Sequence, residues 1–164
     1  MKQQTSLYES ILGPLLLVAD EQGLTEIRFL TDVPPQAQAA GQDRPLPALQ
    51  AAARWLDQYF DGCTPDIPVP LHLSETPFQR EVREIVQTIG RGQTMTYGEI
   101  ASRIAAQRGI PRMAAQAVGQ ALGRNPIPIL IPCHRVTGAR GNLTGYGGGL
   151  ERKRLLLELE NPGN

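Results

Sequence analysis

The sequence predicts an α/β protein of the α+β class, with strands and one helix early in the chain and mostly helices later. Three observations predict this class. Short apolar runs separated by turn residues fill residues 7–30. Apolar residues recur at helical spacing over residues 46–60 and again over 76–122. A segment with three prolines, residues 63–70, lies between these regions, so we expect two domains, 1–70 and 71–164.

The first domain is expected to hold a three-stranded antiparallel meander followed by a helix. Turn residues separate three candidate strands, Leu7–Ile11, Leu15–Asp20 and Leu24–Leu30. Residues 33–47 contain four prolines and a glycine, which is typical of a loop. The helix follows over Leu46–Phe60, with its apolar side chains on one face.

The second domain is expected to be helical. Thr76 and Pro77 predict a helix start, because threonine is a good N-cap and proline suits the first turn. We expect that helix to end at Gly90. A second helix opens at Thr96 or Tyr97 and is broken by the Gly-Ile-Pro sequence at 109–111.

A third helix is expected over Met113–Leu122, and with the second it has the outline of a helix-turn-helix. One face of it has almost no side-chain bulk, because it carries Ala114, Ala115, Ala117, Gly119 and Ala121. Such a face suits close helix packing, and it also suits the minor groove of DNA. Both interpretations stay open at this point.

The charge is balanced overall, with 16 Lys+Arg against 16 Asp+Glu, but it is uneven along the chain. Residues 1–80 hold five basic and ten acidic residues, and residues 81–164 hold eleven and six. A polyanion would therefore meet the second domain first, although chance is the alternative explanation. The sequence has neither a membrane-length apolar run nor a secretory signal, so we expect a cytoplasmic protein without a membrane partner.

The segment Asn125–Val136 carries the clearest chemical signal. Cys133 follows an apolar, proline-stiffened run and directly precedes His134. A thiolate is a strong nucleophile, and it needs a base or a cation nearby to form at neutral pH. The pair is therefore a candidate nucleophile and base, and a structural cysteine beside a chance histidine is the alternative.

Neither a metal nor another cofactor is expected. The candidate ligands Cys63, His72, Cys133 and His134 lack the spacing of a zinc site. The glycine-rich run at 145–149 is not followed by the Lys-Ser/Thr of a phosphate loop. We expect it to be a loop that needs positive φ angles and close approach of the backbone.

The residues around Cys133 resemble the O6-alkylguanine-DNA alkyltransferase family. The stretches that carry the resemblance are Ile131–Val136 (Ile-Pro-Cys-His-Arg-Val), Gly123–Pro126, Leu143–Leu150, Thr76–Val82 and Tyr97–Ala101. The resemblance is strong over residues 76–160. The first domain fits only in outline, as the family's small sheet domain of RNase H-like type.

The resemblance implies DNA repair by direct reversal, with the activity of a methylated-DNA–protein-cysteine methyltransferase. The protein would bind duplex DNA through the minor groove and rotate the damaged base out of the stack. It would then move an alkyl group from O6 of guanine, or from O4 of thymine, to Cys133 in a single turnover. The implied partner is double-stranded DNA containing O6-alkylguanine, and we expect a monomer.

The resemblance also implies roles for single residues. His134 would take the thiol proton through a water molecule, and Glu160 would orient His134. Asn125 would brace the turn before the cysteine, and Tyr97 would help to turn the nucleotide and donate to guanine N3 or a phosphate. The guanine pocket would be lined by Tyr146, Val136, Gly147 and Lys153. DNA contacts would come from Gln116, Ala115, Ala117, Val118, Ala121, Arg124 and Arg135.

Several positions depart from the family's pattern, and two of them bear directly on the site. Gln116 stands where the family usually has an arginine that fills the space left by the flipped base. Glutamine carries no charge and stacks less well, so we expect weaker DNA binding or slower extrusion but intact chemistry. Arg108 or Arg112 would supply part of the missing charge. Gly147 replaces a serine of some relatives, which leaves more room for a bulky alkyl group.

Two other functions remain open. The first is an alkyl-lesion-binding protein with weak repair, because of Gln116; family members that only sense lesions lack the cysteine, and Cys133 argues against a pure sensor. The second is a Cys–His hydrolase or transferase acting on small molecules with catalytic turnover, against which the helix-turn-helix argues. Cys63 is expected to be inert in each case.

Overall fold

The computed structural model describes residues 2–31 and 44–162. The chain divides into two compact units, Met1–Ser74 and Glu75–Asn164. The domain boundary expected after residue 70 lies just inside the end of the first unit. Most of the loop expected over residues 33–47 falls outside the described residues.

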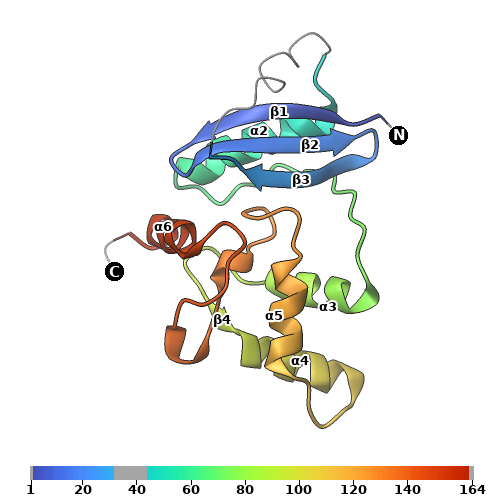
Figure 1. Ribbon diagram of the computed structural model, residues 1–164, viewed down its shortest axis with the longest axis vertical. Helices are drawn as coiled ribbons and strands as arrows, with labels where there is room; N and C mark the ends of the chain where they lie inside the picture. Colours follow the sequence, from blue (N-terminus) through green and yellow to red (C-terminus); the bar gives the residue numbers. More distant parts are fainter. Residues whose placement is uncertain (1, 32–43, 163–164) are drawn as a thin grey trace. The chain divides into compact units, whose positions relative to one another are not determined.

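The first unit is a sheet with one helix on it. Its three antiparallel strands, in the order β1-β2-β3, are β1 (Gln4–Ser10), β2 (Gly13–Asp20) and β3 (Gly23–Phe29). The predicted meander is confirmed. Helix α2 (Pro47–Phe60) lies along one face of the sheet (Figure 1). Leu15 and Leu17 alternate inward from β2 and are fully buried, as is Leu56 of α2.

The first strand ends one residue before the predicted Ile11. Ile11 and Leu12 belong to the turn that leads to β2, and the Leu12 N–H donates to Ser10 Oγ at 3.1 Å. This side-chain hydrogen bond competes with continued pairing of the strand, which explains the early end.

The described part of the second unit is built on four α-helices, which are α3 (Pro77–Val86), α4 (Tyr97–Arg108), α5 (Ala115–Gly123) and α6 (Leu150–Glu160). Capping boxes start α3 and α4, through Thr76 with Gln79 and Thr96 with Glu99. Gly109 ends α4 at φ 67°, in the left-handed region that favours glycine. Helices α4 and α5 lie against each other as the predicted helix-turn-helix (Figure 1).

Two helix ends lie two or more residues from the prediction. Helix α3 ends at Val86 instead of Gly90, because the residues between them form tighter i→i−3 hydrogen bonds. Helix α5 begins at Ala115 instead of Met113. Ala114 has an extended backbone, with φ −73° and ψ 129°, so it cannot lie inside the helix and is instead the residue that precedes it.

A parallel pair of two-residue strands, β4 (Met95–Thr96) and β5 (Val136–Thr137), escaped the sequence analysis. Met95 pairs with Val136, and Thr96 pairs with Thr137. Two short 3-10 helices flank β5, η1 (Cys133–Arg135) before it and η2 (Ala139–Gly141) after it. The pairing therefore fixes the cysteine segment beside the start of α4.

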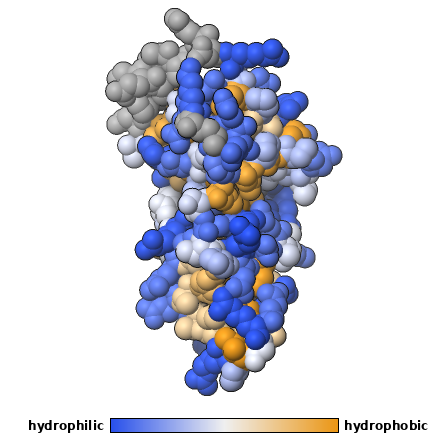
Figure 2. Space-filling model, turned by 90° about the vertical axis from the view of Figure 1, so that its right-hand side faces the viewer, coloured by the Kyte–Doolittle hydropathy of each residue, from blue (hydrophilic) through white to orange (hydrophobic). Residues whose placement is uncertain are grey.

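The surface is mixed in character. Figure 2 shows one face of the molecule, on which hydrophilic side chains predominate and apolar side chains form patches between them. In the part of the chain that the structure describes, no helix is long and apolar enough to span a membrane.

Candidate active site

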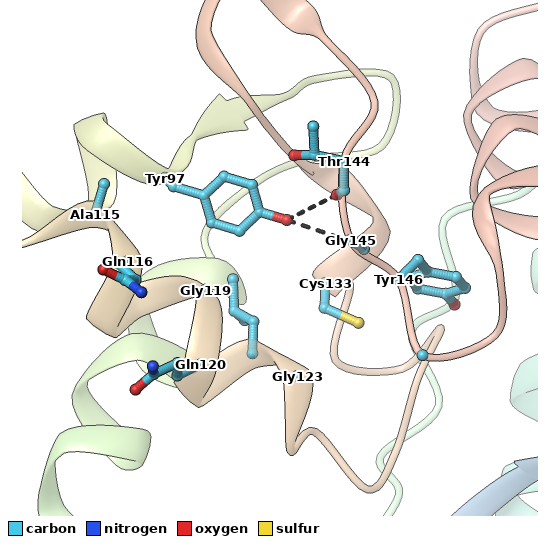
Figure 3. Close-up of a pocket in the computed structure, with 12 residues that line it drawn as sticks. Tyr97, Ala115, Gln116, Gly119, Gln120, Gly123, Cys133, Thr144, Gly145 and Tyr146 are labelled. Atoms are coloured by element: carbon cyan, nitrogen blue, oxygen red, sulfur yellow. Dashed lines mark hydrogen bonds between the residues drawn. The ribbon is translucent and has the colours of Figure 1, made fainter.

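A cavity of about 600 Å³ lies in the second unit, between α5 and the segments that carry Cys133 and residues 144–147 (Figure 3). Its volume falls in the range of pockets that bind small molecules or single bases. Its lining consists of Tyr97, Ala115, Gln116, Gly119, Gln120, Leu122, Gly123, Cys133, Thr144, Gly145, Tyr146 and Gly147.

Asn125 braces the turn that leads to the cysteine. Its Nδ2 donates to Ile131 O and to Cys133 Sγ, each at 3.1 Å, and its Oδ1 accepts from the Ile127 N–H at 3.1 Å. Within this turn Ile129 adopts a φ of 75°, which is rare for a β-branched residue. Such strain persists only where surrounding contacts hold it, and the Asn125 side chain supplies three of them.

Cys133 reaches the cavity although its residue surface is only 9% exposed. In Figure 3 its side chain points toward Tyr146. Burial raises the pKa of the Cys133 thiol, while the hydrogen bond from Asn125 and the positive charge of Lys153 pull in the opposite direction. The resting cysteine is therefore a thiol, and its reaction as a nucleophile requires a group that accepts its proton.

His134 and Glu160 form a fully buried pair. The distance between His134 Nε2 and Glu160 Oε2 is 2.5 Å, and both side chains have no exposed surface. Burial lowers the pKa of His134, although the neighbouring Glu160 opposes this. A neutral imidazole that donates from Nε2 to the carboxylate carries its accepting lone pair on Nδ1. The pair can therefore act as an oriented base.

Tyr97 and Lys153 bind the same two carbonyl groups. The Tyr97 hydroxyl donates to Thr144 O at 3.0 Å and to Gly145 O at 3.5 Å. Lys153 Nζ donates to Thr144 O at 2.8 Å and to Gly145 O at 3.2 Å, and it lies 5.7 Å from the centre of the Tyr97 ring. Burial raises the pKa of Tyr97 and lowers that of Lys153. Both side chains thus fix the loop that covers the cysteine.

The cavity gathers six of the residues predicted for the site: Tyr97, Ala115, Gln116, Cys133, Tyr146 and Gly147. An added Cβ at Gly147 would meet no atom within 4 Å, so the space beside this residue is open. Val136 and Lys153 are fully buried and do not line the cavity.

Sequence reasoning missed several lining residues, of which Gln120 is the clearest. Gln120 follows Gln116 by one helical turn and lines the same cavity from α5 (Figure 3). The i, i+4 spacing was the signal that could have found it.

Two residues that were expected to contact DNA lie inside the protein instead. Val118 has no exposed surface and belongs to the core. The side chain of Arg135 is only 12% exposed, and its guanidinium is bonded to Glu160 and to Ile89 O. The charge of Arg135 led us to expect a surface residue, but in the structure this charge is paired with a carboxylate inside the protein.

Arg108 and Arg112, which were expected to supply part of the charge that Gln116 lacks, have different surroundings in the structure. Arg108 Nε donates to Glu81 at 3.1 Å, and its guanidinium lies 5.5 Å from the centre of the Phe78 ring. Arg112, which precedes α5, is exposed. Arg112 is therefore the better placed of the two to meet a phosphate.

His72 has a structural partner in the first unit. Its Nδ1 lies 2.7 Å from Asp20 Oδ2. Among the described residues no group of three or more His, Cys, Asp or Glu side chains is arranged to hold a metal ion.

The site and the fold together define a class of protein: a thiol-dependent transferase that carries a helix-turn-helix. Two family models match the chain. They are the ribonuclease-like domain of 6-O-methylguanine DNA methyltransferase over residues 4–73 and its DNA binding domain over residues 77–162. The chain belongs to this family of DNA-repair alkyltransferases, and its enzyme activity is that of a methylated-DNA–protein-cysteine methyltransferase.

Curated relatives support the assignment along nearly the whole chain. The methylated-DNA–protein-cysteine methyltransferase of Mycobacterium tuberculosis is 45% identical over 152 residues, which are 93% of this chain and 88% of the relative. The protein of the same name from Methanosarcina acetivorans is 41% identical over 159 residues, 94% and 96% of the two chains.

A solved structure agrees with the fold. The Mycobacterium tuberculosis protein OGT in complex with DNA matches with a TM-score of 0.78 and 43% identity, over 96% of this chain and 92% of that chain.

Proposed function

We propose that the protein repairs O6-alkylguanine in duplex DNA by moving the alkyl group to Cys133, once per molecule. The observation that carries the proposal is the position of the Cys133 thiol in a cavity large enough for one base. In the reaction the bond between O6 and the alkyl carbon breaks, and a bond between sulfur and that carbon forms. The resulting thioether has no route back to a thiol, so each molecule acts once. O4-alkylthymine presents an equivalent leaving group.

The thiol proton would leave toward His134. A water molecule between the thiol and Nδ1 would relay it, while Glu160 holds the other ring nitrogen. The guanine is the leaving group of this displacement but stays in the DNA strand. It gains one proton, from Tyr97 or from water, which balances the proton that the thiol gives to His134, so the repaired base is neutral. Asn125 keeps Sγ in line by its hydrogen bond to the sulfur.

Tyr97 would exchange its partner when the base enters. Its hydroxyl would turn from Thr144 O toward guanine N3 or a phosphate. Lys153 binds the same two carbonyls, so neither would lose its only donor in this exchange. The carbonyl group of Cys133 would accept from the exocyclic amine of guanine, and Tyr146 and Gly147 would flank the base.

The protein would bind DNA as a monomer, with α5 in the minor groove and the damaged base rotated into the cavity. Ala115, Ala117 and Ala121 give this helix low bulk, and Arg124 is exposed at its end. The related Mycobacterium tuberculosis protein was crystallised in complex with DNA, which supports DNA as the partner. Because basic residues meet phosphates, affinity should fall as salt concentration rises.

A titration with excess damaged duplex tests the proposal. The number of repaired lesions should rise to one per protein molecule and then stop. Continued turnover would contradict a single-use acceptor and would favour a catalytic transferase. Binding without any repair would leave only the lesion-binding alternative.

Replacing Gln116 with arginine should raise the rate of alkyl transfer from duplex DNA by about fivefold. A charged donor to the orphaned base is worth about 1 kcal/mol more than a neutral amide. Single-turnover kinetics on a duplex with O6-methylguanine measure the effect. The exposed Gln107, on α4 and outside the cavity, provides a Gln107→Arg control with the same added charge. An equal gain in both variants would show that charge alone matters and would refute the role given to Gln116.

A further inference from the structure

Arg135 brings a permanent charge into the interior of the second unit. Its Nε donates to Glu160 Oε1 at 2.8 Å, and its Nη2 donates to Glu160 Oε2 at 3.1 Å. Its third nitrogen, Nη1, donates to Ile89 O at 2.7 Å. The guanidinium therefore grips one carboxylate with two nitrogens and ties it to the turn after α3.

Glu160 is in turn the residue that holds the imidazole. Its Oε2 receives both His134 Nε2, at 2.5 Å, and Arg135 Nη2. The carboxylate and the imidazole have no exposed surface, and a buried carboxylate is costly unless a cation accompanies it. A protonated His134 would serve as that cation, but it would then be unable to accept a proton. Arginine stays charged at every pH that a protein survives, so it frees His134 from this task.

We propose that Arg135 is a positioning residue for alkyl transfer, which keeps Glu160 ionised and aimed at His134. The imidazole then keeps its proton on Nε2 and offers Nδ1 to the thiol proton. This inference rests on the proposed transfer to Cys133, and it gives Arg135 a role inside the protein in place of the DNA contact expected from sequence.

Other charged groups surround this cluster. Lys153, from α6, lowers the pKa of His134 through its charge, and Arg135 does the same. Lys153 itself binds the carbonyls of Thr144 and Gly145. Arg91 approaches the end of the same helix, with Nη2 3.5 Å from Leu159 O. Loss of the Arg135 charge should therefore let His134 keep its proton to higher pH.

Single-turnover rates of alkyl transfer, measured across the pH range in which histidine titrates, test the inference. In Arg135→Met the maximal rate should fall by about tenfold or more. The rising limb of the pH profile should also move upward by about one unit or more. Arg135→Lys keeps the charge but not the fork, so it should lose part of the rate and keep the wild-type midpoint.

The control is an ion pair of the same kind elsewhere in the unit. Arg83 Nη2 lies 2.6 Å from Glu75 Oε1, and both side chains are mostly buried. Arg83→Met should cost stability and leave the pH profile of transfer unchanged. A shifted profile in this control would mean that lost stability causes the shift, which would overturn the role of Arg135.

Nitrogen-15 NMR of the imidazole gives a readout that does not depend on activity. The chain has two histidines, so a His72→Gln background leaves the signal of His134 alone. We expect the Nε2-protonated tautomer near neutral pH, and we expect Arg135→Met to lose that preference. An unchanged tautomer and an unchanged pH profile in Arg135→Met would overturn the inference.

The double variant Arg135→Met/Glu160→Gln covers the case in which Arg135→Met fails to fold, because it removes both buried charges together. In the Glu160→Gln background, Arg135→Met should cause no further loss of rate, whereas independent roles would give additive losses. Absence of transfer by the wild-type protein would instead contradict the proposed function itself.

Discussion

Replacing Asn125 with alanine should destabilise the protein by about 2 kcal/mol or more and slow alkyl transfer by about tenfold or more. The substitution removes the donor to Ile131 O and the acceptor of the Ile127 N–H, both in a partly buried turn. It also removes the hydrogen bond to Cys133 Sγ. Because Ile129 is held at a positive φ in the same turn, loss of the brace should let the turn relax and move the sulfur.

Chemical denaturation measures the stability of this variant, and single-turnover kinetics measure its rate. Asn142→Ala, at an exposed position of the second unit, is the matched control and should change neither quantity by much. If Asn125→Ala kept the wild-type rate, Asn125 would be a structural residue without influence on the sulfur.

Replacing Glu160 with alanine should have the largest effect on stability, a loss of about 3–5 kcal/mol. The Arg135 guanidinium is mostly buried, and two of its nitrogens donate to the Glu160 carboxylate. The substitution leaves this buried charge without its partner. It also deprives the buried His134 of its acceptor at Nε2. The rate of transfer should fall with it, because the imidazole loses the group that fixes its tautomer.

A surface carboxylate on the same helix provides the comparison. Glu158 pairs with Arg154 in the open, with 54% of the Glu158 side chain exposed. Glu158→Ala should cost well under 1 kcal/mol, since exposed ion pairs contribute little. Equal losses of stability in Glu158→Ala and Glu160→Ala would mean that the buried cluster stabilises the fold no more than an exposed ion pair does.

Sequence patterns predicted the fold well where caps and turn residues fix the ends of helices and strands. The capping residues Thr76 and Thr96 fix helix starts through their own side chains, and Gly109 ends α4 because only a few residues accept its backbone angles. The strands of the first unit follow from turn residues between apolar runs. The starts of helices without a capping side chain were less certain, as α5 shows by beginning after Ala114.

The sequence predicted the reacting residues of the candidate site, but it did not predict the strand pairing and the ion pair that hold them. Cys133 and His134 were singled out from the residues themselves and Glu160 through the resemblance, and the structure brings the last two together. The pairing of β4 with β5 joins segments that are far apart in the chain, so no local sequence pattern predicts it. The same holds for Arg135: its charge suggested a surface contact with DNA, and only the fold reveals that the charge is buried against Glu160.

The central claim is that Cys133 accepts the alkyl group, and peptide mass spectrometry of the reacted protein tests it most directly. After reaction with a duplex carrying O6-methylguanine, the peptide that contains Cys133 should be heavier by one methylene unit. The Cys63 peptide should be unchanged, and a Cys63→Ala variant should react fully. A Cys133→Ala variant should gain no mass and leave the lesion in the DNA. Repair by Cys133→Ala, or a methyl group found on another residue of the wild-type protein, would contradict the account.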